Sequence, residues 1–212
     1  MEIKEYLTVK GESEKLNIIE RSKFITYIKG VEDETDAKAF IEQIKKKHSL
    51  ATHNCYAYIA DELGLIQKFS DDGEPQGTAG MPILEVLKNR KIYKTCVVVT
   101  RYFGGVKLGA GGLVRAYSGV TALGLDETEI LKMTTCTDFK VKAEYDGYSK
   151  IIKSVNNIDS VIVDTNFGDG VECLVVVKND KVDAFLNKLK DVFKGNEQVE
   201  KVGERYFSFE KV

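Results

Sequence analysis

The chain has 212 residues, of which 43% are hydrophobic and 30% are charged, and its formal net charge is −2. This length and composition predict one large domain or two modest domains with a hydrophobic core. We expect a cytoplasmic protein without a membrane contact, because the sequence has no apolar run long enough to span a bilayer and no apolar core of a signal peptide. The four cysteines are widely spaced, which excludes a CxxC-type site, and we predict no bound metal and no cofactor.

The N-terminal part of the chain is predicted to form a hairpin and a helix. Residues 1–30 contain alternating apolar positions, with a turn at Gly11–Lys15 and a bulge or exposed corner at Glu20–Lys23. Asp33–Asp36 then supply an N-cap and an acidic first turn for a helix that ends near His48. Two strands, Cys55–Ala60 and Leu65–Phe69, and an apolar helix, Ile83–Leu87, are predicted next.

Four titratable residues near these strands are candidates for catalysis or metal binding: His53, Asp71, Asp72 and Glu74. Histidine is the side chain that titrates near neutral pH, although a single histidine beside a strand is more often a structural residue. Three carboxylates in one turn could bind Mg²⁺ or share a proton, although acidic turns with Gly and Pro are also common solvated loops. Both interpretations stay open for each candidate.

A strand, a glycine-rich loop and a helix form the centre of the chain. The β-branched run Cys96–Thr100 predicts a buried strand, and Arg101 and Tyr102 follow at its end. Apolar residues then recur at three and four positions in a helix that should follow Gly112 and end by Gly124. The glycines of this unit are Gly104, Gly105, Gly109, Gly111 and Gly112. They allow either positive φ angles and the close approach of a ligand, or simply tight packing of the strand against the helix.

The same unit is basic. From Val86 to Leu125 the chain has no Asp or Glu, and it contains Lys88, Arg90, Lys91, Lys94, Arg101, Lys107 and Arg115. Because the whole chain is almost neutral, we expect a local positive field here. The N-terminus of the following helix, together with Lys107 and Arg115, would form an anion site. The loop matches neither the Walker pattern nor the dinucleotide-binding pattern, so neither nucleotide fold is predicted.

The C-terminal part has a simpler pattern of six elements. The predicted strands are 136–145, 160–166, 171–177 and 199–210, and the predicted helices are 146–155 and 182–193. The order βαββαβ is that of a ferredoxin-like fold, which we expect over residues 135–212. Residues 1–130 would then form a separate domain.

Several stretches of the chain resemble one known family. SDDGEPQGTAGMPIL (Ser70–Leu84) and VTRYFGGVKLGAGGLVRAY (Val99–Tyr117) resemble the signature of the YigZ and IMPACT family, also called uncharacterised protein family 0029. ERSKFI (Glu20–Ile25) and ATHNCYAYI (Ala51–Ile59) resemble further blocks of this family. The resemblance implies an α+β protein of two domains. The first would be a two-layer Impact N-terminal-like domain similar to domain IV of elongation factor G, and the second a ferredoxin-like domain of the DUF1949 type, similar to domain V of that factor.

The leading hypothesis for function is a non-catalytic protein that binds RNA or the ribosome and could regulate translation. The residues assigned to phosphate or nucleic-acid contacts are Arg101, Tyr102, Gly104, Gly105, Lys107, Gly109, Gly111, Gly112 and Arg115. One alternative is an enzyme that acts on a phosphorylated or nucleotide substrate, with its acidic turn facing the glycine loop across one cleft. Another alternative is a module that docks to a protein partner, as the resemblance to the eukaryotic members implies.

Overall fold

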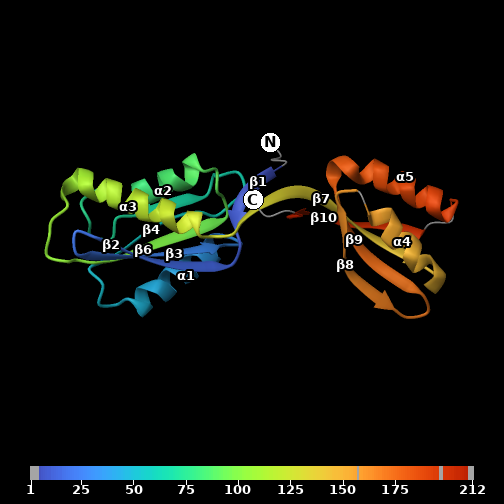
Figure 1. Cartoon of the computed structure of the whole chain (residues 1–212), viewed down its shortest axis with the longest axis horizontal. Helices are drawn as coiled ribbons and strands as arrows, with labels where there is room; N and C mark the ends of the chain where they lie inside the picture. The colour runs from blue at the N-terminus through green and yellow to red at the C-terminus, as the bar shows by residue number, and fades with distance from the viewer. Residues whose placement is uncertain (1–4, 157, 196–197, 210–212) are drawn as a thin grey trace. The chain divides into compact units, whose positions relative to one another are not determined.

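The computed structural model describes residues 5–156, 158–195 and 198–209. The chain divides into two compact units, one built mainly from residues 1–132 and the other from residues 133–210. Both units combine antiparallel sheets with helices, which confirms the predicted α+β class (Figure 1). Within the part of the chain that the structure describes, no helix is both long and apolar enough to cross a membrane.

The first unit is built around a five-stranded antiparallel sheet in the order β2-β3-β6-β4-β5. Its strands are β2 (Glu12–Ile19), β3 (Ser22–Gly30), β4 (His53–Ile59), β5 (Gln67–Ser70) and β6 (Thr95–Tyr102). The predicted buried strand at Cys96–Thr100 is confirmed, because β6 lies at the centre of the sheet and every residue of it before Tyr102 is buried. The short strand β1 (Glu5–Val9) pairs with β7 (Ile130–Ala143), and the first residues of β7 belong to this unit.

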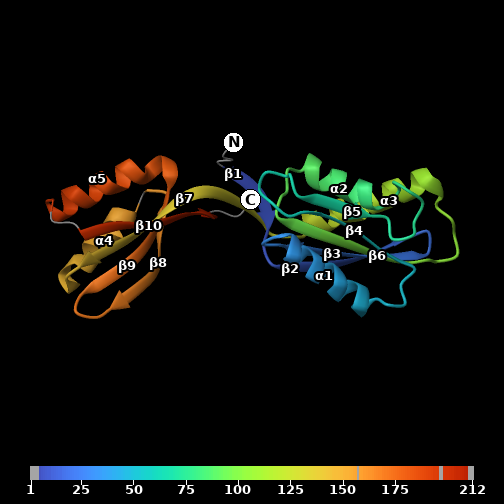
Figure 2. The ribbon, with the colours of Figure 1, turned by 180° about the vertical axis from the view of Figure 1, so that it is seen from behind.

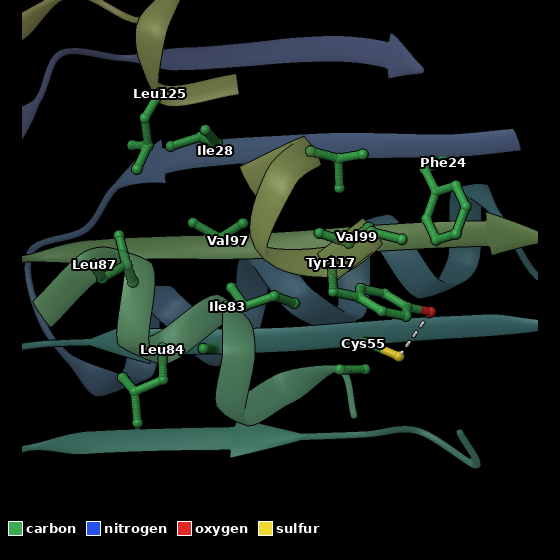
Figure 3. Packing of buried hydrophobic residues seen from close by; sticks show 14 of the residues in the cluster. Phe24, Ile28, Cys55, Ile83, Leu84, Leu87, Val97, Val99, Tyr117 and Leu125 are labelled. Carbon is green, nitrogen blue, oxygen red and sulfur yellow. Dashed lines mark hydrogen bonds between the residues drawn. The ribbon is translucent and has the colours of Figure 1, made fainter. Parts of the chain in front are cut away.

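Helices cover both faces of this sheet. Helices α2 (Gly80–Asn89) and α3 (Gly109–Asp126) pack on one face, where Tyr117 and Ile83 meet Val97 and Val99 of β6 (Figure 3). Helix α1 (Glu34–Lys47) packs on the other face through Phe40 and neighbouring apolar side chains. This unit therefore has a helix layer on each side of the sheet, which corrects the expected two-layer arrangement.

The predicted helix at Asp33 is confirmed in detail. Asp33 is the N-cap of α1, and its carboxylate accepts a hydrogen bond of 2.8 Å from the backbone N–H of Asp36. Helix α1 ends at Lys47, and His48 is its C-cap. The capping chemistry of the sequence was sufficient to place this helix.

The N-terminal part of the chain forms a hairpin, but the predicted position of its turn is wrong. Strands β2 and β3 form the hairpin, and Glu20 and Arg21 make the two-residue turn between them, with φ angles of 45° and 65°. Residues 12–15, which were expected to turn, belong to β2. The bulge or exposed corner predicted at Glu20–Lys23 therefore contains the turn itself, which was not recognised as one because such turns usually contain Asn and Gly.

The glycine-rich loop is shorter than predicted. Helix α3 already begins at Gly109, so Gly111 and Gly112 lie in its first turn and only Phe103–Leu108 connect β6 to it. Helix α2 likewise begins earlier than predicted, at Gly80. Glycine is a poor helix former in a helix interior, but Gly80, Gly109, Gly111 and Gly112 lie in the first turns of their helices.

The second unit has the predicted βαββαβ order (Figure 2). After β7 come the 3-10 turn η1 (Tyr145–Gly147), α4 (Tyr148–Val155), β8 (Ser160–Phe167), β9 (Val171–Lys178), the 3-10 turn η2 (Asn179–Lys181), α5 (Val182–Phe193) and β10 (Gln198–Phe207). The sheet order β10-β7-β9-β8 is antiparallel throughout, which is the ferredoxin-like arrangement. Ile151 of α4 and Phe185 and Leu189 of α5 belong to its core. The predicted last strand extended to residue 210, which lies outside the described residues.

All four cysteines are free thiols and are buried. Cys55 and Cys96 lie in strands of the first unit, and Cys136 and Cys173 lie in strands of the second. Burial is the main reason why the pKa of each thiol is raised, to about 11 for Cys136. These thiols therefore stay protonated and act as small apolar side chains.

Candidate functional site

The site is built at the end of β6 where the glycine loop begins, which we call the loop end of the first unit. Its centre is a buried ion pair in which Arg101 Nη1 donates to Glu74 Oε1 at 2.6 Å. Arg101 Nη2 also donates to Ser22 Oγ at 3.3 Å, and the guanidinium carbon lies 5.3 Å from the centre of the Phe24 ring. Arg101 is only 4% exposed, so this pairing removes it from the phosphate contacts that we expected.

Glu74 also accepts a hydrogen bond from another element. The hydroxyl of Tyr117 on α3 donates to Glu74 Oε1 at 2.8 Å. Burial above all raises the pKa of the Tyr117 phenol, so the hydroxyl stays protonated and keeps donating. Cys55 Sγ lies 3.4 Å from the Tyr117 oxygen (Figure 3) and 2.9 Å from the carbonyl oxygen of Asp71, and its single proton can be donated to either. The network therefore connects β4, β6 and α3 with the turn that contains Asp71, Asp72 and Glu74, which we call the acidic turn.

His53 joins this network from the first position of β4. Its Nδ1 lies 2.8 Å from the carbonyl oxygen of Asp72, and this oxygen can only accept, so Nδ1 carries a proton. Its Nε2 lies 3.7 Å from Glu74 Oε2. Both ring nitrogens thus face atoms of the acidic turn. The structure brings His53 and Glu74 together, which sequence spacing alone could not establish.

The two aspartates of the acidic turn are occupied with the folding of that turn. Asp71 Oδ1 accepts from the backbone N–H groups of Ala79 and Gly80, and its Oδ2 accepts from that of Gly77. Asp72 Oδ2 accepts from the backbone N–H of Asn54 at 2.6 Å. Within the described residues, no group of three or more His, Cys, Asp or Glu side chains could hold a metal ion. Asp71 therefore orders the entry to α2, whereas Asp72 connects the turn to β4 and lies 3.7 Å from the ammonium group of Lys45 on α1.

The glycines of the loop have different structural reasons. A Cβ atom on Gly104 would lie 2.1 Å from the carbonyl carbon of Arg21, so only glycine allows the loop to pack against the β2–β3 turn. Gly105 and Gly109 have φ angles of 85° and 69°, which favour glycine, and a Cβ atom on either would meet open space. Close packing thus explains Gly104, and backbone conformation explains Gly105 and Gly109.

Residues 86–125, which contain no Asp or Glu, are called the acid-free segment below. Its seven cations do not form one surface. Four of them are paired with carboxylates: Lys88 with Glu85, Arg90 with Asp126, Lys94 with Glu32 and Arg101 with Glu74. Lys88, Arg90, Lys91 and Lys94 precede β6, so they lie at the strand end away from the loop. Lys107 and Arg115 are exposed and, among the described residues, have no ion-pair partner. Of these seven cations, Lys107 and Arg115 are therefore the two that contribute free positive charge at the loop end.

A cavity of about 450 Å³ lies between the β2–β3 turn, the glycine loop and the start of α3. Its charged lining residues are Glu20, Lys107 and Arg115. Helix α3 has no side-chain hydrogen bond at its N-cap and no acidic residue in its first turn. The unpaired N–H groups and positive end of this helix therefore lie beside two free cations.

The two aromatic residues at the end of β6 have separate roles. Tyr102 accepts or donates a hydrogen bond of 2.9 Å with His48 Nδ1, and His48 Nε2 lies 2.6 Å from the Tyr27 hydroxyl. Burial lowers the pKa of His48. Phe103 is 47% exposed, and its ring lies 5.6 Å from the guanidinium carbon of Arg101. Phe103 rather than Tyr102 is therefore the aromatic surface at the loop end.

Sequence reasoning missed Ser22, Tyr117, His48 and Glu20 as parts of this region. Ser22 and Glu20 lie in the block ERSKFI, for which the sequence predicts a bulge or exposed corner and a family resemblance but no place in a site. Tyr117 was counted as an apolar position of a helix face, although its hydroxyl needs a partner when it is buried. A polar side chain at a position predicted to be buried was thus the signal by which the sequence could have identified this hydrogen-bond network.

The chain is similar in sequence to a known family of proteins. The family model of the Impact N-terminal domain matches residues 20–125. The chain is 40% identical over 194 residues to IMPACT family member YvyE of Bacillus subtilis, with 92% of this chain and 89% of that protein covered. It is 35% identical over 183 residues to IMPACT family member YigZ of Escherichia coli, with coverages of 85% and 90%.

A solved structure described as that of a hypothetical protein has a similar fold. Its TM-score is 0.62 at 32% sequence identity, and the match covers 94% of this chain and 98% of that one. The shared sequence and the shared fold extend over nearly the whole chain. The chain therefore belongs to the IMPACT family.

Proposed function

We propose that the protein is a non-catalytic RNA-binding protein and that its binding surface is the loop end of the first unit. The observation that carries this proposal is the cavity in which Lys107 and Arg115 have no ion-pair partner among the described residues. Free cations beside the N-terminus of a helix are a typical arrangement for binding phosphate groups.

An exposed aromatic ring supports RNA as the phosphate-bearing ligand. Phe103 is half exposed and lies in the same loop as Lys107. Single-stranded nucleic acids bind to surfaces that combine cations for the backbone with aromatic rings for the bases. Ribosomal RNA is the candidate that we place first, because the family resemblance implies two domains similar to those of a ribosomal elongation factor. A role in the regulation of translation would follow from that partner.

The neighbouring titratable groups favour binding over catalysis. Glu74, Arg101 and Tyr117 are bonded to one another and buried, and both nitrogens of His53 face the acidic turn. Asp71 is saturated by backbone N–H groups. A general acid or base must reach the substrate. None of these groups lines the cavity that contains Lys107 and Arg115.

The proposal is tested by fluorescence anisotropy with a labelled single-stranded RNA over a series of salt concentrations. Lys107→Gln and Arg115→Gln should each weaken binding several-fold, because each removes one phosphate contact. Each should also reduce the slope of log K against log salt by about 0.7, the value for one contact on a single strand. Ribosome cosedimentation of the same variants then identifies the partner.

Lys91→Asn is the matched control. Lys91 belongs to the same acid-free segment and is exposed, but it precedes β6 and lies away from the cavity. Its φ angle of 55° is tolerated by Asn, so the variant removes the charge without a new backbone conflict. This control should bind RNA as the wild type does. Equal effects of all three variants, or no binding by the wild type at low salt, would rule out the loop end as an RNA surface.

A further inference from the structure

The cavity at the loop end contains a carboxylate that a simple phosphate site does not explain. Glu20 lines the same cavity as Lys107 and Arg115. No ion pair of Glu20 occurs within the described part of the chain, although cations line the same space. A free carboxylate in this place repels an anionic ligand. Its presence therefore points to a ligand that offers a hydrogen-bond donor close to its phosphate.

The backbone holds Glu20 in a fixed and unfavourable conformation. Glu20 and Arg21 both have positive φ angles, at positions where Asn and Gly are usual. The turn is also locked in place, because Gly104 packs directly against the backbone of Arg21 and Ser22. Residues held in sparsely populated conformations cluster at functional sites. The positive φ angle of a long acidic side chain in this turn is therefore a second reason to look for its ligand.

We propose that Glu20 makes the site select RNA over DNA by accepting a hydrogen bond from a ribose 2′-hydroxyl. This inference rests on the proposed function, in which Lys107 and Arg115 hold the neighbouring phosphate. The 2′-hydroxyl is the group by which proteins distinguish RNA from DNA, and hydrogen bonds to a carboxylate are stronger than those between neutral groups. On DNA the carboxylate has no donor to meet, and only its repulsion of the phosphates remains.

The test compares the binding of three oligonucleotides of one sequence by fluorescence anisotropy: single-stranded RNA, single-stranded DNA and 2′-fluoro RNA. The wild type should prefer RNA over DNA by roughly tenfold, the size expected for one hydrogen bond to a charged group. The 2′-fluoro RNA keeps the sugar conformation of RNA but has no hydroxyl donor, so it should bind as weakly as DNA. Glu20→Asn shortens and neutralises the side chain, and it should bring the ratio of RNA to DNA affinity close to one.

Arg21→Asn is the matched control in the same turn. Asn tolerates positive φ at both positions, so the two variants are comparable in backbone strain. Arg21→Asn changes the same turn but removes no carboxylate, so the ratio of RNA to DNA affinity should stay that of the wild type. An unchanged ratio in Glu20→Asn, or tight binding of 2′-fluoro RNA, would overturn the role of Glu20. If the wild type binds neither RNA nor DNA, the proposed function itself fails, which is a distinguishable result.

Discussion

Arg101 and Arg115 belong to the same acid-free segment but lie in opposite environments. Arg101 is buried in an ion pair with Glu74 and holds the base of the glycine loop. Arg115 is exposed beside a cavity and has no ion-pair partner among the described residues. A count of positive charges along the sequence treats both alike. The comparison shows that the partners of each charge, and not the charges themselves, decide which residues are free to bind a ligand.

The largest effect is expected from removing the carboxylate of the buried pair. Glu74→Gln leaves the guanidinium of Arg101 buried without its counter-charge, and the side chains of both residues are about 5% exposed. Breaking a buried ion pair from one side typically lowers the free energy of unfolding by about 3–5 kcal/mol. Urea denaturation followed by circular dichroism measures this loss.

Glu85→Gln is the control for that experiment. It removes the carboxylate partner of Lys88 at the protein surface, where both side chains are almost half exposed. Such a pair contributes about 0–1 kcal/mol. The double variant Arg101→Met with Glu74→Leu should recover much of the stability lost in Glu74→Gln, because no unpaired charge remains. Equal losses in Glu74→Gln and Glu85→Gln would contradict the assignment of Arg101 to a structural role.

A smaller effect is expected where the glycine loop meets the β2–β3 turn. Gly104→Ala forces the loop away from Arg21, since the added Cβ would overlap the backbone of that residue. Overpacking of this kind costs about 1–3 kcal/mol of unfolding free energy. Gly119→Ala in the interior of α3 is the control, because its Cβ would meet open space. The control should be neutral or gain about 0.5–1 kcal/mol, and thermal unfolding distinguishes the two variants.

The smallest effect concerns His48, which is less buried than Arg101 and less exposed than Arg115. Burial lowers the pKa of His48 in the folded state below its ordinary value of 6.5. The unfolded chain therefore binds a proton more readily, so stability should be constant above pH 6.5 and should fall as the pH drops through the pKa of the folded state. His48→Gln should remove this part of the pH dependence. Urea denaturation between pH 5 and 8 measures it, and an identical profile for both proteins would show that His48 is not responsible.

The elements that were predicted correctly from the sequence are those whose determinants are local. The cap at Asp33, the buried strand β6 and the βαββαβ order of the second unit follow from residues that are near one another in the chain. The pairing of Glu74 with Arg101, and of Tyr117 with Glu74, depends on the folding of three separate elements onto one another. No local pattern records such contacts, so the sequence overestimated the free positive charge of the loop.

The turn at Glu20 and Arg21 was predicted only as a bulge or exposed corner, for a related reason. Its backbone conformation is one that Asn and Gly favour, and the long-range packing of Gly104 stabilises it instead. The first turn of α3 was missed because Gly111 and Gly112 disfavour a helix by propensity alone. A tertiary contact overrides the local preference of the chain at the turn, whereas the glycines of α3 lie only in its first turn, where the helix begins.

Chemical modification of the four buried thiols would report local unfolding of this protein. Since burial keeps each of them protonated and away from solvent, a thiol reagent can modify them only when the surrounding strands separate. Each unit carries two of them, Cys55 and Cys96 in the first and Cys136 and Cys173 in the second. The pattern of alkylated peptides therefore records which unit has opened, without any label added to the native chain.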